Sequence, residues 1–272
     1  MQYNELEKLG ERVSRLGFGC MRFPTTPEGG IDEPRAEAML DSAYRAGVNY
    51  FDTAYFYHQH TSEAFVGRMM KKYPRDSFRL ATKMPMSIVT SLDQAKEIFE
   101  GQLAALQTEY VDFYLFHALN GERWEQAKAM GIVGYLEEQQ RAGRIRHFGF
   151  SFHDSYEVFE KILTEREWDF CQIQYNYMDR DIQAGDRGYE LARKMGIPMI
   201  VMEPVKGGML SGLPKEAQAI LEEADPERSP ASWALRWVGS HPGVKLVLSG
   251  MSSEEQLEDN IRTFSPFVPL GT

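Results

Sequence analysis

The chain has 272 residues, of which 43% are hydrophobic, 12% aromatic and 26% charged. This composition is ordinary for a folded globular protein, and it excludes disordered and collagen-like classes. The chain has 30 lysines and arginines against 40 aspartates and glutamates, and its net charge of −10 argues against a polyanion-binding surface, although local donors could still hold a small anionic cofactor.

The predicted elements begin with a weakly alternating segment over residues 2–13, which we expect to form a small β-hairpin at the base of a barrel. Further along, short apolar runs bounded by Gly, Pro or polar residues predict buried parallel strands. In chain order these strands cover residues 14–19, 49–54, 78–84, 111–118, 146–152, 169–176, 198–204 and 245–250. Apolar residues at helical spacing predict helices between them, among others over residues 33–47, 91–107, 155–166 and 186–196.

Eight strands separated by seven helix-bearing connections predict an α/β fold, a (β/α)8 TIM barrel with a short N-terminal β-hairpin. The chain length also suits a barrel, which usually takes about 250 residues. An open doubly wound sheet would show the same alternation and is the alternative. Since no low-complexity linker divides the chain, we expect a single domain over residues 1–272.

The two cysteines, Cys20 and Cys171, form no metal-type or C-x-x-C spacing. This predicts a reducing, cytoplasmic setting and no structural metal. The N-terminus has no apolar signal core, and no run approaches the roughly 18–20 apolar residues of a membrane span. We therefore expect a soluble cytoplasmic protein that binds neither membranes nor nucleic acid.

Two motifs that would suggest other chemistry are incomplete. Gly17 and Gly19 begin a G-x-G, but Arg22 stands where the dinucleotide fingerprint needs its last glycine. The segment 149–153 imitates a nucleophile elbow, but His153 replaces the second glycine that the strained turn needs. A Rossmann-type site and a serine hydrolase are both disfavoured.

Polar residues at the carboxyl ends of the predicted strands suggest an active site, since barrel enzymes place their chemistry there. Asp52 lies inside the apolar run 49–54, Lys83 closes the next run and His117 the one after, while Tyr55 and Tyr57 lie on the loop directly after the run that holds Asp52. Each residue alone has a structural explanation. Together they would face one another across the barrel mouth, where pairing would offset the cost of burying each ion.

Several segments in this order resemble the aldo-keto reductases. NYFDTAYFYHQHTSEAFVG resembles the D-T-A-x-x-Y segment of that family, and ATKMP and LFHALN resemble its lysine and histidine segments. GFSFHD, QIQYNYMD, EPVKGGML and SGMSSEEQLEDNI resemble its cofactor segments. The resemblance runs from about Leu16 to Asn260 and implies the barrel, a nicotinamide cofactor and the reduction of small carbonyl compounds.

The resemblance implies a catalytic tetrad of Asp52, Tyr57, Lys83 and His117, and the spacing after Asp52 selects Tyr57 over Tyr55. Tyr57 would be the general acid that meets the carbonyl oxygen. We expect the Lys83 ammonium to lower the pKa of Tyr57, with Asp52 holding the lysine charged and oriented. His117 would donate a hydrogen bond to the carbonyl oxygen and polarise it.

The resemblance also implies the residues around an extended cofactor. Ser151 and Gln172 match the residues that hold the carboxamide, and Glu203 stands where many relatives carry a stacking aromatic ring. The expected cofactor-binding residues are Ser151, Gln172, Glu203, Pro204, Lys206, Gly207, Gly208, Gly250, Met251, Ser252, Gln256 and Asn260. Within this set, Lys206 and the two glycines match the pyrophosphate loop, and the residues from Gly250 onward lie around the adenosine.

We expect NADPH as the cofactor, with NADH as the open alternative. Relatives that strongly prefer NADPH carry basic residues at the positions of Gly250 and Gln256, where this chain has none. The chain is similar to a branch of the family whose barrels continue into a cysteine-rich iron–sulfur tail, but residues 261–272 contain no cysteine.

Two other functions compete with carbonyl reduction. One is a nicotinamide-binding redox sensor or regulatory subunit with little turnover. The other is a metal-dependent barrel hydrolase that uses His58, His60 and Asp52. No acidic cluster or third histidine lies nearby in the sequence, so a polar loop above the barrel is the simpler interpretation of the two histidines.

Overall fold

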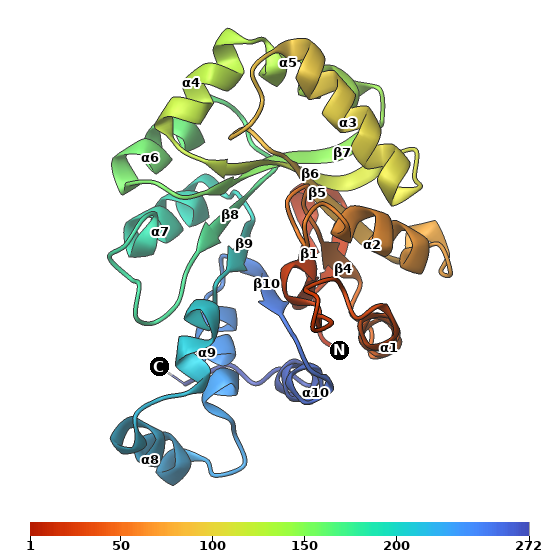
Figure 1. Ribbon diagram of the computed structural model, residues 1–272. Coiled ribbons are helices and arrows are strands. Elements are labelled where there is room, and N and C mark those ends of the chain that lie inside the picture. Colours follow the sequence, from red (N-terminus) through yellow and green to blue (C-terminus); the bar gives the residue numbers. More distant parts are fainter. Residues whose placement is uncertain (272) are drawn as a thin grey trace.

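The computed structural model describes residues 1–271, and Thr272 lies outside the described residues. Eight parallel strands form a closed barrel in the order β10-β3-β4-β5-β6-β7-β8-β9, surrounded by helices (Figure 1). The strands are β3 (Leu16–Gly19), β4 (Tyr50–Asp52), β5 (Arg79–Met84), β6 (Val111–Leu119), β7 (Ile145–Phe152), β8 (Phe170–Gln174), β9 (Met199–Met202) and β10 (Val244–Gly250). The predicted TIM barrel is confirmed.

The helices surround the barrel, and all of them except α10, which follows the last strand, lie in connections between successive barrel strands (Figure 1). They are α1 (Glu33–Arg45), α2 (Ser62–Met70), α3 (Leu92–Leu106), α4 (Gly121–Ala129), α5 (Ile132–Arg141), α6 (Tyr156–Glu165), α7 (Gly185–Met195), α8 (Lys215–Ala224), α9 (Pro230–Gly239) and α10 (Glu254–Thr263). Four short 3₁₀ segments complete the described elements: η1 (Glu7–Leu9), η2 (Cys20–Arg22), η3 (Arg75–Ser77) and η4 (Lys206–Ser211).

The N-terminal hairpin pairs β1 (Tyr3–Leu6) with β2 (Glu11–Ser14) in an antiparallel two-stranded sheet, as predicted. It closes the base of the barrel. Leu6 and Val13 are buried in one cluster with barrel residues such as Phe113, and Glu11 accepts hydrogen bonds from Arg79 and His147. The amino ends of the strands are therefore sealed, which leaves their carboxyl ends as the open mouth.

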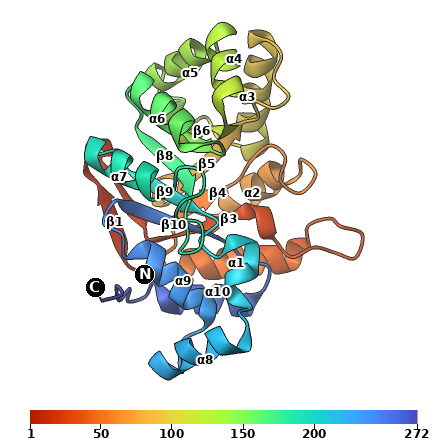
Figure 2. The same ribbon diagram turned by 90° about the vertical axis from the view of Figure 1, so that its left-hand side faces the viewer.

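Both described ends of the chain are fixed at this base. The backbone N–H of Gln2 donates to the carbonyl of Phe264 at 3.1 Å, and the N–H of Phe267 donates to the side-chain carbonyl of Gln2. The N–H of Leu270 donates to the Ser240 hydroxyl at the end of α9. In Figure 2 both ends lie on the same side of the molecule as β1.

Most helices bury an apolar face against the barrel, but α8 does not. It buries none of its ten residues and projects from the body of the molecule (Figure 1). Within residues 1–271, no helix combines the length and the apolar character needed to cross a membrane.

Candidate active site

The carboxyl ends of the barrel strands surround a cavity of about 600 Å³. Asp52 comes from the end of β4, Lys83 from β5 and His117 from β6, while Tyr57 lies on the loop after β4. All of the expected site residues except Lys206 line this cavity: Asp52, Tyr57, Lys83, His117, Ser151, Gln172, Glu203, Pro204, Gly207, Gly208, Gly250, Met251, Ser252, Gln256 and Asn260.

The Lys83 ammonium is the best-defined feature of the cavity. It is fully buried, and it donates to Asp52 Oδ1 at 2.6 Å, to the Thr53 carbonyl at 2.7 Å and to the Tyr57 hydroxyl at 3.4 Å. These three acceptors satisfy its three protons. Burial alone would lower the pKa of Lys83, but the Asp52 carboxylate and the Tyr57 hydroxyl outweigh it and raise the pKa above its ordinary value. Lys83 is therefore charged at neutral pH.

Tyr57, and not Tyr55, lies beside Lys83. The Lys83 ammonium also lies 4.9 Å from the centre of the Tyr57 ring, whereas Tyr55 packs against Phe56 and His60 and does not line the cavity. Burial raises the pKa of Tyr57 above its ordinary value, and the nearby lysine offsets only part of this effect. The direction differs from the expected lowering because the sequence alone does not show how much desolvation the phenol suffers.

His117 is positioned by an irregularity in β6. The pairing of β6 with β7 shifts register between Phe116 and Leu119, and Ala118 has a positive φ of 48°. The Ala118 N–H donates to the Ser151 hydroxyl at 2.8 Å, which holds this bulge in place. Burial and the charge of Lys83 lower the pKa of His117 to about 3, so its imidazole is neutral and keeps one N–H donor.

A buried polar network supports the backbone of Lys83 from behind. Gln102 on α3 donates to the Lys83 carbonyl at 2.9 Å and to Glu63 at 2.7 Å, while Tyr114 donates to the Gln102 side chain at 2.6 Å. The sequence analysis did not select these residues because a glutamine on a helix gives no signal that it reaches a strand. The network fixes the backbone that carries the ammonium.

The cavity offers polar groups that suit a nicotinamide ring. Gln172 donates to the Met202 sulfur at 3.5 Å, while its carbonyl oxygen is buried and has no partner within residues 1–271. A carboxamide N–H₂ is a donor that this oxygen lacks. The adjacent Ser151 lies directly beside Gln172 in the β7–β8 pairing. The residues present therefore fit the nicotinamide end of the expected cofactor.

The loop after β9 brings its backbone to the cavity in left-handed conformations. Glu203 and Lys206 have φ values of 55° and 50°, and Gly207 and Gly208 have φ values of 64° and 101°. The two glycines line the cavity with no side chain to keep a ligand away. This suits a pyrophosphate held by backbone donors.

Lys206 is placed differently from the expectation. Its ammonium pairs with the buried carboxylate of Asp179, whose other oxygen accepts from Asn176 at 2.9 Å and Gln174 at 3.0 Å. A buried carboxylate requires a partner, and Lys206 supplies it. The lysine therefore does not line the cavity.

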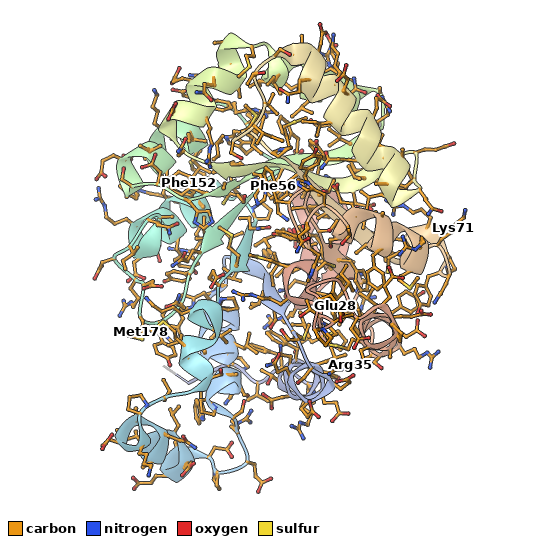
Figure 3. All side chains as sticks on the ribbon, in the orientation of Figure 1. Glu28, Arg35, Phe56, Lys71, Phe152 and Met178 are labelled. Atoms are coloured by element: carbon orange, nitrogen blue, oxygen red, sulfur yellow. The ribbon has the colours of Figure 1, made fainter. Side chains whose placement is uncertain are left out.

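Three expected residues at the far end of the cavity are held by local hydrogen bonds. Asn260 donates to the Ser249 hydroxyl at 2.7 Å, and the Gln256 side chain accepts from the Ser252 N–H at 2.8 Å. The nearby Glu254 pairs with Arg35 of α1 at 2.9 Å, and Figure 3 shows Arg35 beside α10.

The cavity also has walls that the sequence analysis missed. They include Met21 and Arg22 on η2, Phe56 over the middle of the barrel (Figure 3), and further residues from the strands, loops and helices around the mouth: His58, His153, Met202, Val205, Ser211, Ala231, Leu248 and Ser249. Position directly after a predicted strand was the available signal for Met21 and Arg22.

The alternative metal site finds no support in this geometry. Within residues 1–271 no group of three or more His, Cys, Asp or Glu side chains is arranged to hold a metal ion. His60 packs against the rings of Tyr55 and Phe56 and does not line the cavity.

The fold and the site define a (β/α)8 barrel with an enzyme-type cavity at the carboxyl ends of its strands, built around a buried lysine–carboxylate pair and a tyrosine. The sequence pattern of the Aldo/keto reductase family matches residues 15–269. The chain belongs to this family, and membership supports NAD(P)H-dependent oxidoreduction as its class of reaction.

Individual relatives agree with the family. The chain is 25% identical over 304 aligned positions to the uncharacterized oxidoreductase YrpG of Bacillus subtilis (strain 168), covering 96% of this chain and 90% of the relative. It is 26% identical over 211 positions to the "Probable aldo-keto reductase 1" of Glycine max, covering 75% of this chain and 59% of that protein. The holo structure of the aldo-keto reductase AKR11C1 from Bacillus halodurans is 28% identical, with a TM-score of 0.82 over 100% of this chain and 93% of that one.

Proposed function

We propose that the protein reduces aldehydes or ketones with NADPH, with Tyr57 as the general acid. The observation that carries this proposal is the Lys83 ammonium, which lies between Asp52 and the Tyr57 hydroxyl at the edge of the cavity. A carbonyl oxygen entering this cavity would meet a phenol, a neutral imidazole and a nearby fixed positive charge.

A bound reduced nicotinamide supplies a hydride to the carbonyl carbon, and the side chains of this chain handle the charge that develops on the oxygen. Tyr57 donates its hydroxyl proton to that oxygen. Lys83 stabilises the phenolate left behind, and Asp52 keeps the ammonium in place. His117, neutral at working pH, donates its N–H to the same oxygen and orients the carbonyl.

For the cofactor, Gln172, with its unpartnered oxygen, and Ser151 would hold the nicotinamide carboxamide. Gly207 and Gly208 would present backbone N–H groups to the pyrophosphate, with Glu203 and Pro204 beside them. The segment from Gly250 to Asn260 would enclose the adenosine. We propose NADPH over NADH by family habit, and the ratio of the two dissociation constants tests this choice.

We also propose that residues 1–272 form one domain and that the protein works in the cytoplasm. The continuous barrel over the described residues supports the first statement. Cys20 and Cys171, both buried and unbridged, agree with a reducing compartment.

Replacing Tyr57 tests the proposed function. Tyr57→Phe removes the proton donor and keeps the ring, so we expect turnover of a reactive aldehyde to fall by about 100-fold or more, the lower end of general acid catalysis. The dissociation constant for NADPH, measured by fluorescence titration, should stay within about twofold of wild type.

Tyr55→Phe is the matched control, because Tyr55 lies two residues away and does not line the cavity. It should leave turnover unchanged. Equal turnover in Tyr57→Phe and wild type would refute the acid role. If the wild type binds NADPH but turns over no carbonyl from a broad aldehyde panel, the protein is a nicotinamide sensor instead.

A further inference from the structure

Four charged side chains line the cavity, and two of them pair with each other. Two are acidic, Asp52 and Glu203, and two are basic, Arg22 and Lys83. Lys83 is committed to Asp52 at the inner end. Lys206, the expected cation, is committed to Asp179 outside the cavity.

The histidines of the cavity do not add positive charge at neutral pH. Burial lowers the pKa of His58, His117 and His153 in each case. The remaining basic group is Arg22 on η2. It is exposed, and within residues 1–271 it makes no side-chain hydrogen bond or ion pair.

Arg22 lies across the end of β10. A β-carbon built on Gly250 would come within 2.6 Å of Arg22 Cγ and 3.0 Å of Arg22 Cβ. The aliphatic stem of the arginine thus rests on the glycine, and any larger residue at 250 would displace it. Because Gly250 has no side chain, the side chain of Arg22, which follows β3, can lie across the end of β10.

A nicotinamide dinucleotide brings a negative charge on each phosphate of its pyrophosphate, and NADPH adds a further phosphate on the ribose. Glu203 would repel these groups, and backbone donors supply only part of the compensation. A guanidinium is suited to phosphate because it can donate two parallel hydrogen bonds.

We propose that Arg22 is the cationic side chain that binds a phosphate group of the dinucleotide in this cavity, an inference that rests on the proposed function. Arg22 thereby takes the part that the sequence analysis gave to Lys206 or found missing at Gly250 and Gln256. The charge reaches the cofactor from the segment after β3 instead of from the loops after β9 or β10.

The test is a fluorescence titration of the purified protein with NADPH and with NADH. Arg22→Gln keeps a polar stem and removes the charge. Arg35→Gln is the matched control, because it removes the same charge from the same rim, and Arg35 binds Glu254 outside the cavity. We expect Arg22→Gln to weaken NADPH binding by about 10-fold or more, as loss of a charge-assisted hydrogen bond implies, and Arg35→Gln to change it less than twofold.

Comparing the binding of NADPH and NADH shows which phosphate Arg22 binds. A loss for NADPH alone assigns Arg22 to the ribose phosphate, and an equal loss for NADPH and NADH assigns it to the pyrophosphate. If Arg22→Gln binds both cofactors less than fivefold more weakly than Arg35→Gln does, the inference is overturned and the proposed function stays intact. A wild type that binds neither cofactor overturns both.

A second pair of variants tests the placement. In Arg22→Ala combined with Gly250→Lys, loss of Arg22 Cγ removes the 2.6 Å clash and leaves one tight Cβ contact of 3.0 Å, and a positive charge returns to the same region. We expect this double variant to bind NADPH at least fivefold more tightly than Arg22→Ala alone. No recovery in a double variant with the wild-type melting temperature would contradict the proposal.

Discussion

At the scale of single residues, the site depends on one buried ion pair. Lys83 and Asp52 are each almost completely removed from solvent, and their charges are 2.6 Å apart at the nearest atoms. Burying either charge alone is costly, and most of that cost is offset only while both are present. The pair therefore links the stability of the barrel to the residues of the candidate active site.

Replacing one member of this pair should destabilise the protein more than replacing both. Lys83→Met leaves the Asp52 carboxylate buried without its partner, and we expect it to lower the free energy of unfolding by about 3–5 kcal/mol. Lys83→Met combined with Asp52→Leu should recover most of that loss. Urea unfolding of the three proteins tests this prediction, and a double variant that is no more stable than Lys83→Met would contradict it.

The pH dependence of kcat/KM should show no histidine titration. The pKa of His117 is about 3, so the imidazole is already neutral throughout pH 5–8. The pKa of Tyr57 is raised, so the phenol stays protonated over the same range. We expect a flat profile between pH 5 and 8 in the wild type, because kcat/KM reports ionisation of the free enzyme. An acid limb near pH 6.5 that disappears in His117→Gln would show that this imidazole titrates.

The candidate site residues could be predicted where their position relative to a predicted strand was enough to identify them. Asp52, Lys83 and His117 each lie at or near the carboxyl end of a buried run, and barrel geometry brings such positions together. The partner of a long side chain was not predictable. Lys206 reaches Asp179, and the stem of Arg22 reaches Gly250, because of contacts between segments remote in sequence.

At the scale of elements, the α2–α3 contact depends on the absence of a side chain. A β-carbon on Gly67 in α2 would lie 2.4 Å from the Ala105 carbonyl oxygen and 2.7 Å from Leu106 backbone atoms. The two helices can pack this closely only with glycine at position 67.

Gly67→Ala should therefore lower the free energy of unfolding by about 1–3 kcal/mol, the usual cost of overpacking. Gly101→Ala on α3 is the control, because nothing lies within 4 Å of a β-carbon there. Gly101→Ala should raise the free energy of unfolding by about 0.4–1 kcal/mol, because alanine reduces the conformational entropy of the unfolded chain. Thermal unfolding compares the two, and equal effects would show that the contact is not tight.

The strands were predicted better than the helices. Each strand is a compact run buried on both faces, which is a clear sequence signal. The sequence analysis assigned no separate helix to α2, α4, α5, α8 or α9. α8 carries apolar residues at helical spacing, Ala217, Ile220, Leu221 and Ala224, but the helix buries none of its residues. A connection with two helices leads to the next strand just as a connection with one helix does. The number of predicted strands therefore does not reveal the second helix.

At the scale of the whole molecule, the hairpin is fastened to the barrel by Glu11, which binds Arg79 and His147 across the base. Burial alone would raise the pKa of Glu11, but the hydrogen bonds from these two residues outweigh it and hold the pKa below its ordinary value of 4.5. The ionised carboxylate thus stabilises the fold above about pH 4.5, and this contribution is lost as the pH falls through the lowered pKa.

Glu11→Gln should lower the free energy of unfolding by about 1–3 kcal/mol at pH 7. The difference from wild type should shrink as the pH falls from 5 to 3. Glu5→Gln on the same hairpin is the control, because Glu5 and its partner Arg12 are more than half exposed and should contribute little. Chemical unfolding at several pH values measures both, and a difference that is constant with pH would contradict the role of Glu11.

The placement of both ends of the described chain, residues 1–271, at the sealed base has a practical consequence. Gln2 binds Phe264 and Phe267 there, on the opposite side of the barrel from the cavity. A dye, a reporter protein or a tether to a solid support attached at either end would start from the face that takes no part in the chemistry. Immobilised in this way, the molecule would present its open mouth to the surrounding solution.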